Sequence, residues 1–279
     1  MRLGHWVVIC DVKDPASAVE TLREKHSDGI GRVYGTVCDV SDADSVEALG
    51  EFAKDNLGII HYWINNAGIN GGRRPFSDVP TKVVEAVVKV NLVGVLVCTQ
   101  VALKIMQQQK GVTSHIFNTV GSGVKGGGTP GYVCYGATKR GLPQMTDSLV
   151  KELTEGVPGY DMPDTPGTVN VRSPAATTPP TRHRHRGAFE PPSHHASLSR
   201  HCARQSLHES LSAPRAPQCH VLSPGMVFTD LLLNDSTPEL RKFPFGVLAA
   251  QPPEVAADLV PKMLAVSGNG AKVRRRWLH

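Results

Sequence analysis

The sequence lacks the features that would place the protein in a membrane or in an oxidising compartment. No apolar run approaches the length that spans a bilayer. The amino terminus leads directly into the apolar run 6–10, without the pattern of a signal or transit peptide. The six cysteines are scattered and none forms a C-x-x-C pair. We therefore expect reduced thiols in an intracellular protein without a transmembrane segment.

The sequence also lacks a broadly basic surface, although its formal net charge is +5. Residues 156–218 carry seven arginines against four acidic residues, and residues 274–276 are all arginine. The remainder is close to neutral, so we expect no nucleic-acid partner. Two histidine clusters, 183–185 and 194–195, have no carboxylate or thiol at ligand spacing, and we expect no metal site.

What the sequence does contain is a regular alternation of strand and helix patterns, which predicts βαβ units and a parallel sheet. Ser41 has the position of an N-cap for a helix that carries Val46 and Leu49 on its apolar face. The expected strands are 7–10, 33–37, 59–64, 115–118 and 220–223, and the other expected helices are 15–26, 81–109, 135–153 and 253–266.

One part of a dinucleotide-binding fold is missing from this pattern. Such a fold opens with a strand, a glycine-rich turn and a helix whose amino end holds the pyrophosphate. Residues 7–10 instead resemble its second strand. The predicted fold class is α/β, a Rossmann-like doubly wound parallel sheet in a single domain that lacks the first strand and the Gly-rich loop. We expect this loss to remove a central part of the sheet and to expose a strand edge.

The segment 156–218 does not fit the domain. It is rich in proline, serine, histidine and arginine and shows no sustained helical or strand period. A long segment that cannot bury apolar area is typical of disorder. We predict that 1–155 and 219–270 form the domain, that 156–218 is a low-complexity disordered insert, and that 271–279 is a basic tail.

The chemistry depends on Tyr135 and Lys139, which lie one helical turn apart on the same face. A phenol and an ammonium in that arrangement can protonate a carbonyl oxygen while a hydride arrives from a nicotinamide. Ser122 lies thirteen residues before Tyr135, and Asn91 interrupts an apolar run. With the turn Asn65-Asn66-Ala67-Gly68 and the late Pro224-Gly225, these features resemble the short-chain dehydrogenase/reductase family.

The resemblance implies a role for each catalytic residue. Tyr135 would be the general acid in reduction, and the charge of Lys139 would lower the pKa of its phenol. Lys139 would also hold the nicotinamide ribose. Ser122 would polarise the substrate carbonyl, and Asn91 would hold a water that connects Lys139 to solvent.

The resemblance also implies NADPH or NADH as cofactor. Asp11 ends an expected strand, where an acid usually binds the ribose 2′-hydroxyl and favours NADH, but Lys13 could reach a 2′-phosphate. Asp39 is equally well explained as a helix-capping acid. The other implied contacts are Asp39 and Val40 at the adenine, Asn65, Ala67 and Gly68 at the adenosine ribose, Pro224, Gly225 and Thr229 on the nicotinamide side, and Tyr135 and Lys139.

More specific strings, such as His115-Ile116-Phe117-Asn118 and Thr229-Asp230-Leu231-Leu232-Leu233, resemble chlorophyll(ide) b reductases of the non-yellow-colouring type, a branch of that family. This resemblance implies reduction of the 7-formyl group of chlorophyll(ide) b to 7-hydroxymethyl, in the chloroplast and at or near thylakoids. The sequence departs from this branch at Asp11-Val12, where relatives typically carry Ser-Arg. It also departs at Pro143, which should kink or weaken the active-site helix.

Two other functions are compatible with the sequence. The chain could be a non-catalytic remnant that associates with related reductases, because the phosphate loop is missing. It could also be a short-chain reductase of another carbonyl, because the general motifs are shared across the family. A homo-oligomer or a hetero-oligomer with related reductases is expected only from family habit.

Overall fold

The computed structural model confirms the predicted α/β class. It describes residues 4–27, 29–121, 127–160, 215–227, 229, 238, 242 and 249–275. The strands are β1 (Val7–Asp11), β2 (Val33–Val37), β3 (Tyr62–Asn65), β4 (His115–Thr119), β5 (Gln218–Ser223), β6 (Met226–Val227), β7 (Ala249–Ala250) and β8 (Lys272–Arg274). The helices are α1 (Ala16–Lys25), α2 (Ala43–Leu57), α3 (Thr81–Val88), α4 (Gly94–Met106), α5 (Val133–Glu155) and α10 (Pro252–Leu264), with a 3-10 turn η1 (Phe76–Asp78) and a π-helical turn η2 (Lys89–Val93).

The strands pair in parallel, as the alternation of elements predicted, but the sheet is divided. β3, β4, β5 and β8 form a four-stranded sheet in that order, whereas β1 pairs with β2 in a separate two-stranded sheet. A short pair, β6 with β7, lies beyond β5 in sequence. Among the described residues, β1 and β3 therefore each have one paired neighbour.

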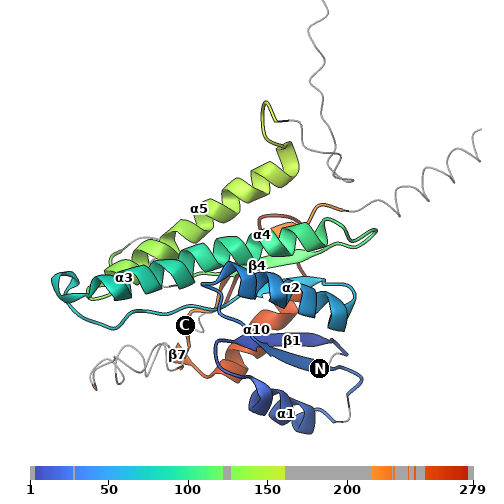
Figure 1. Ribbon diagram of the computed structural model, residues 1–279, viewed down its shortest axis with the longest axis horizontal. Coiled ribbons are helices and arrows are strands. Elements are labelled where there is room, and N and C mark those ends of the chain that lie inside the picture. The colour runs from blue at the N-terminus through green and yellow to red at the C-terminus, as the bar shows by residue number, and fades with distance from the viewer. Residues whose placement is uncertain are drawn as a thin grey trace, which may run out of the picture.

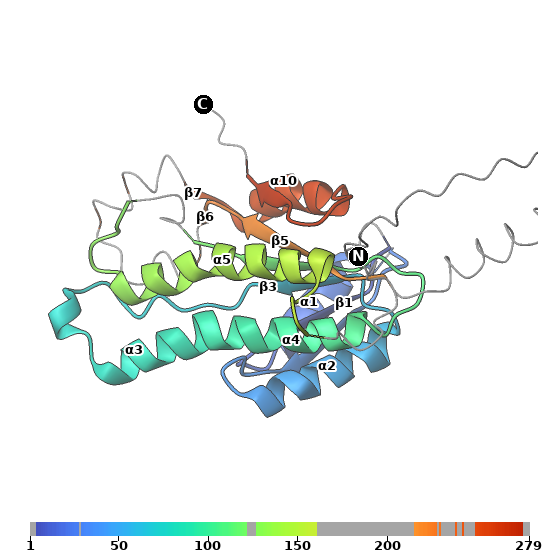
Figure 2. The same cartoon turned by 90° about the horizontal axis from the view of Figure 1, so that it is seen from above.

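Helices cover both faces of the strands (Figures 1 and 2). The main core cluster joins α2, α4 and the end of α5 to the inner faces of β3, β4 and β5, and includes Val46, Trp63, Val101 and Ile116. A second cluster packs α10 on the opposite face, around Phe117. Contacts between α1 and β2 cover the outer part of that same opposite face.

The long helix expected at 81–109 is continuous from Thr81 to Met106, with η2 between α3 and α4. We expected no segment long and apolar enough to span a bilayer. That expectation was wrong, because one helix meets the requirement in length and in composition. The Thr81–Met106 helix has a mean hydropathy of 1.9 over its most apolar window, of which 44% is buried. Its α4 part packs against α2, and its α3 part packs against α5, as a core helix does.

Several expected boundaries were wrong. Ser41 is not the N-cap of α2; Asp42 is, and Ser41 instead donates from its N–H and its hydroxyl to the Asp39 carboxylate. β3 begins at Tyr62 rather than at residue 59. Residues 272–274 are not part of a tail, because they form β8 beside β5, where the buried Val273 joins the α10 cluster.

The expected insert 156–218 lies mostly outside the described residues. Its last residues belong to the domain, since Pro217 is fully buried and Gln218 begins β5. Arg215 donates to the Thr113 hydroxyl over 3.2 Å. The rest of that prediction concerns residues 161–214, which include both histidine clusters and lie outside the described residues. It therefore stays a prediction.

Candidate active site

The candidate site lies where the parallel strands end. Their carboxyl ends share one edge of the sheet, so the segments that follow β3, β4 and β5 meet there. Residues 66–69 follow β3, residues 120–121 follow β4, and residues 224–225 follow β5. The N–H of Val120 donates to the carbonyl of Leu222 over 2.9 Å and joins two of these ends.

Tyr135 lies in the first turn of α5 with its phenol against the end of β4. A Cβ on Gly121 would stand 2.5 Å from the Tyr135 hydroxyl oxygen, so only glycine leaves room for the ring. Burial raises the pKa of the Tyr135 phenol. We expected Lys139 to lower this pKa, and that was wrong for the structure described: desolvation dominates and keeps the phenol protonated.

Lys139 lies one turn further along α5 and is 4% exposed. Its Nζ donates to the backbone carbonyl of Thr119 over 3.0 Å, which ties the ammonium to the end of β4. Burial lowers the pKa of Lys139 to about 8. The same desolvation therefore acts on both members of the pair in opposite directions and moves their pKa values apart.

Asn91 is fully buried in the π-helical turn η2. Its side-chain amide exchanges two hydrogen bonds of 2.8 Å with the backbone of Ile69 and donates to the Thr138 hydroxyl over 3.2 Å. The Thr138 hydroxyl in turn donates to the Tyr135 carbonyl over 2.8 Å. Asn91 therefore joins the loop after β3 to the helix that carries Tyr135 and Lys139, which fits the tendency of π-helical turns to occur at functional sites.

The glycine at the end of the β3 loop completes this arrangement. A Cβ on Gly68 would lie 3.2 Å from the Asn91 Oδ1 atom and 3.3 Å from the Lys139 Nζ atom. Gly68, Asn91, Tyr135 and Lys139 thus converge, as the sequence predicted. Ser122, the other expected catalytic residue, lies outside the described residues.

The expected cofactor residues border the same edge. Asp11 is exposed at the end of β1, where its carboxylate accepts from the N–H of Lys13 over 2.9 Å. The Asp39 carboxylate accepts two hydrogen bonds from Ser41, which lower its pKa. Val40 packs its backbone so closely on α4 that a Cβ on Gly94 would lie 2.7 Å from the Val40 carbonyl oxygen.

The remaining expected cofactor residues occupy the two loops nearest the nicotinamide side. The Asn65 side chain is turned into the core, where it donates to the Thr99 hydroxyl and the Asn118 amide oxygen, so only its backbone faces the edge. Gly225 has a φ of +77°, a left-handed value that favours glycine. Pro224 precedes it, and the exposed Thr229 donates to the Val227 carbonyl.

These residues fit a nicotinamide cofactor at its two ends. The Asp39 carboxylate is the group expected at the adenine, and the Tyr135–Lys139 pair is the group expected at the nicotinamide ribose. Between them, the described residues offer no glycine-rich turn leading from a strand into a helix, which is the element that cradles a diphosphate.

Sequence reasoning missed several residues of the site. Thr138 lies inside the Tyr-x-x-x-Lys spacing, so its position could have identified it. Gly94 and Gly121 are glycines because the Val40 carbonyl and the Tyr135 ring lie too close to them for a Cβ. The Thr119 carbonyl that binds Lys139 is a backbone group. None of these three features leaves a signal in the sequence.

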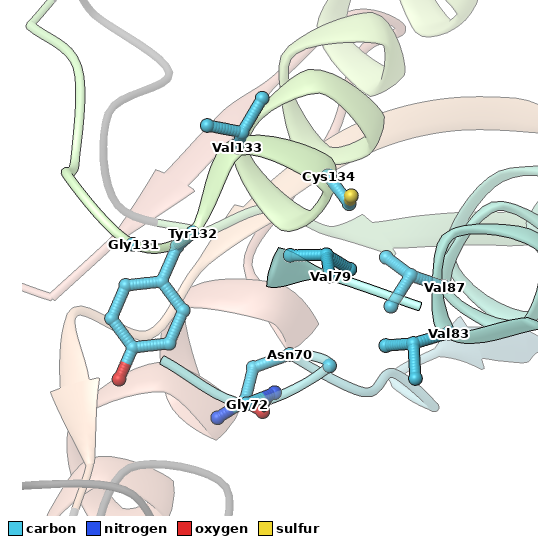
Figure 3. Close-up of a pocket in the computed structure, with 10 residues that line it drawn as sticks. Asn70, Gly72, Val79, Val83, Val87, Gly131, Tyr132, Val133 and Cys134 are labelled. Atoms are coloured by element: carbon cyan, nitrogen blue, oxygen red, sulfur yellow. Dashed lines mark hydrogen bonds between the residues drawn. The ribbon is translucent and has the colours of Figure 1, made fainter. Parts of the chain in front are cut away.

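A small pocket adjoins the start of α5 (Figure 3). Val79, Val83 and Val87 supply its apolar side together with Cys134, the residue next to Tyr135. The other lining residues are Asn70, Gly71, Gly72, Gly131, Tyr132 and Val133. The pocket therefore places apolar surface at the start of the helix that carries Tyr135.

The chain matches the family model of short chain dehydrogenases over residues 1–158. It is 34% identical to a probable chloroplastic chlorophyll(ide) b reductase of Oryza sativa subsp. japonica, over 97% of this chain and 44% of that relative. It is 32% identical to a chloroplastic chlorophyll(ide) b reductase of Arabidopsis thaliana, over 97% of this chain and 62% of that relative. The chain thus spans less than two thirds of the length of these relatives.

Among solved structures, the chain is similar to a 7α-hydroxysteroid dehydrogenase complexed with NADH and 7-oxo glycochenodeoxycholic acid. The TM-score is 0.60 and the identity is 18%, over 96% of this chain and 82% of that structure. At this identity the likeness shows a shared fold.

Proposed function

Because the chain belongs to the short-chain dehydrogenase family, we propose that it is an NAD(P)H-dependent carbonyl reductase whose substrate is the 7-formyl group of chlorophyll(ide) b. The observation that carries the proposal is the position of Tyr135. Its phenol lies at the carboxyl edge against Gly121, with the buried Lys139 one turn behind it.

The reaction adds a hydride to the formyl carbon and a proton to the formyl oxygen, which gives a hydroxymethyl group. The nicotinamide cofactor supplies the hydride when it is bound. Tyr135 supplies the proton, and the raised pKa of its phenol keeps that proton available at neutral pH. Lys139 is mostly protonated at neutral pH and stabilises the phenolate that remains. Asn91 fixes the helix relative to the β3 loop, and we propose that Ser122 polarises the carbonyl.

An aromatic aldehyde suits a site in which a phenol donates the proton and an ammonium lies one turn behind it. A small pocket lined by valines and Cys134 adjoins the start of α5, the helix that carries Tyr135. The similarity to the rice and Arabidopsis reductases supports chlorophyll(ide) b within this substrate class and supports a chloroplast location near thylakoids. Assembly with related reductases is part of the same proposal.

The test is the Tyr135→Phe variant, assayed for NADPH-dependent reduction of chlorophyllide b. Loss of a general acid should lower kcat by about 10²–10⁴-fold. The control is Tyr34→Phe, since Tyr34 lies on β2 against Trp6 and away from the site. A Tyr135→Phe protein as active as wild type would refute the mechanism.

Cofactor choice and substrate are tested separately. A fluorescence titration with NADPH and with NADH should show saturable binding of at least one, and the preferred cofactor decides the role of Asp11. A panel of carbonyl compounds should rank chlorophyllide b first. A higher kcat/KM for a ketoacyl substrate would favour a reductase of another carbonyl, and absence of cofactor binding by folded protein would favour a non-catalytic role.

A further inference from the structure

Two neighbouring arginines, Arg73 and Arg74, lie exposed in the loop that follows β3. The ion pairs found among the described residues lie within α2 and within α10, and neither arginine belongs to one. The nearest acid along the chain, Asp78, accepts a hydrogen bond from the Ser77 hydroxyl over 3.0 Å. The loop therefore carries two guanidinium groups that no described carboxylate holds in an ion pair.

This loop is fixed to the candidate site at two points. At its beginning, the Asn91 side chain exchanges two hydrogen bonds of 2.8 Å with the backbone of Ile69. At its end, the N–H of Arg74 donates to the carbonyl of Gly131 over 3.3 Å. Gly131 lies four residues ahead of Tyr135. Because the loop is tied to the start of α5, a ligand that binds the arginines is placed at a defined position relative to the site.

Two glycines make room for the arginine side chains. A Cβ on Gly131 would stand 2.8 Å from the Cγ atom of Arg73, so the stem of Arg73 packs directly on the start of α5. A Cβ on Gly72 would stand 2.6 Å from the Nη2 atom of Arg74. Both glycines line the small pocket that adjoins α5 (Figure 3). The guanidinium of Arg74 therefore lies at the wall of that pocket.

The arginines are far from the residues expected at the adenine. Asp11 and Asp39 follow β1 and β2, which form the separate two-stranded sheet. Figures 1 and 2 place the segment between β3 and α3 beside the start of α5 and away from β1 and β2. An anion bound at the arginines is therefore part of the substrate rather than the adenosine end of the cofactor.

We propose that Arg73 and Arg74 bind a carboxylate of the substrate, so that the substrate is an acid as well as an aldehyde. Guanidinium groups bind carboxylates through paired, charge-assisted hydrogen bonds. Chlorophyllide b has a free propionate carboxylate on the ring opposite the one that carries its 7-formyl group. In chlorophyll b the same propionate is an uncharged phytyl ester. This inference rests on the proposed function and narrows its substrate to the free acid, chlorophyllide b.

The first experiment compares wild type with the double variant Arg73→Gln/Arg74→Gln in NADPH-dependent reduction of chlorophyllide b and of chlorophyll b. Loss of the charge-assisted hydrogen bonds should raise KM for chlorophyllide b by about 10- to 100-fold. The kcat should stay unchanged, because the arginines bind the substrate away from the reacting carbon. KM for chlorophyll b should also stay unchanged, because the ester has no charge to bind.

The matched control is Lys25→Gln/Arg32→Gln, which removes two exposed charges near the amino ends of the strands. Its kinetic constants should equal those of wild type. Arg73→Lys/Arg74→Lys keeps both charges without the paired geometry and should recover part of the affinity. An equal rise in KM for both pigments, an equal effect in the control, or a rise in KM for NADPH alone would overturn the carboxylate site.

Binding of chlorophyllide a separates this inference from the proposed function, because that pigment has the carboxylate but no formyl group to reduce. Its dissociation constant, measured by quenching of tryptophan fluorescence, should be about 10- to 100-fold higher in the double glutamine variant. Such binding by a protein that does not reduce chlorophyllide b would support the carboxylate site and refute the proposed function. Equal affinity in the two proteins, or no binding to either, would overturn the carboxylate site even if chlorophyllide b is reduced.

Discussion

At the scale of single residues, the site is shaped by desolvation of two titratable groups. Burial raises the pKa of Tyr135 and lowers that of Lys139 to about 8. The neutral phenol is the form that donates a proton in reduction. The ammonium of Lys139 is almost fully buried, with a backbone carbonyl as its hydrogen-bond partner. A charge kept in such a place costs stability, which is common at functional sites.

Replacing Lys139 by Met should therefore lower activity and raise stability. The pKa of Lys139 falls from 10.5 to about 8, which corresponds to a penalty of about 3 kcal/mol at neutral pH. Allowing for the Thr119 carbonyl that the variant leaves without this donor, we expect a gain of about 1–2 kcal/mol in the free energy of unfolding.

The pH dependence checks the cause of this gain. The folded-state pKa lies below the unfolded one, so the penalty is complete below about pH 8 and disappears as the pH rises towards 10.5. Urea unfolding of wild type and Lys139→Met should differ at pH 7 and converge by about pH 10. Lys151→Met, an exposed position on the same helix, should show no such gain. A less stable Lys139→Met protein at pH 7 would contradict this account.

At the scale of elements, both helices that carry the site contain an irregularity. The π-helical turn η2 carries Asn91 between α3 and α4. Pro143 lies inside α5, four residues after Lys139, yet the helix runs unbroken from Val133 to Glu155. Because proline has no N–H, the carbonyl of Lys139 lacks the donor that an α-helix normally provides. We expected Pro143 to kink or weaken the helix; it does not end the helix, and the missing hydrogen bond remains as a local weakness.

Pro143→Ala should stabilise the protein by up to about 3 kcal/mol, the difference between the two residues inside a helix. The measurement is the urea midpoint, with the slope unchanged. Pro252→Ala is the matched control, because Pro252 is the first residue of α10 and proline is well tolerated there. Equal shifts in the two variants would show that the effect does not come from the helix interior.

At the scale of the whole molecule, the face of the sheet under α10 contains a buried pair of histidines. The Nδ1 of His115 and the Nε2 of His220 are 3.0 Å apart, between β4 and β5. The Nδ1 of His220 accepts from the N–H of Ala271, so its Nε2 carries the proton and donates to His115. Burial and the neighbouring His115 lower the pKa of His220 to about 4, and burial also lowers the pKa of His115.

The fold should therefore lose stability in mild acid. The pKa of His220 is 6.5 when unfolded and about 4 when folded, so its contribution is complete above about pH 6.5 and is lost as the pH falls towards 4. We expect a loss of about 2–3 kcal/mol from this group. Urea unfolding between pH 7.5 and pH 4.5 measures it, and His220→Gln should reduce the pH dependence.

His5→Gln is the control for this acid effect, since His5 is exposed ahead of β1. Its pH dependence should match that of wild type. A wild-type protein equally stable at both ends of the pH range would show that the histidine pair is not held neutral by the fold.

The α/β class, the order of most elements and the meeting of Gly68, Asn91, Tyr135 and Lys139 could be predicted from sequence patterns. These are encoded locally: strand and helix periods need only neighbouring residues, and the turn spacing fixes Tyr135 and Lys139 on one face. Strand and helix ends were less exact, as with Ser41 and β8, because capping and edge pairing depend on distant partners.

The contacts that hold the site, and the groups that surround it, could be found only in the folded chain. The hydrogen bonds of Asn91 to Ile69 and of Lys139 to the Thr119 carbonyl join segments far apart in the chain. The direction of the Tyr135 pKa shift was wrong from sequence, because desolvation depends on the packing of all surrounding elements. The division of the strands into a two-stranded and a four-stranded sheet was likewise not visible in the sequence, because strand pairing joins segments that are distant in the chain.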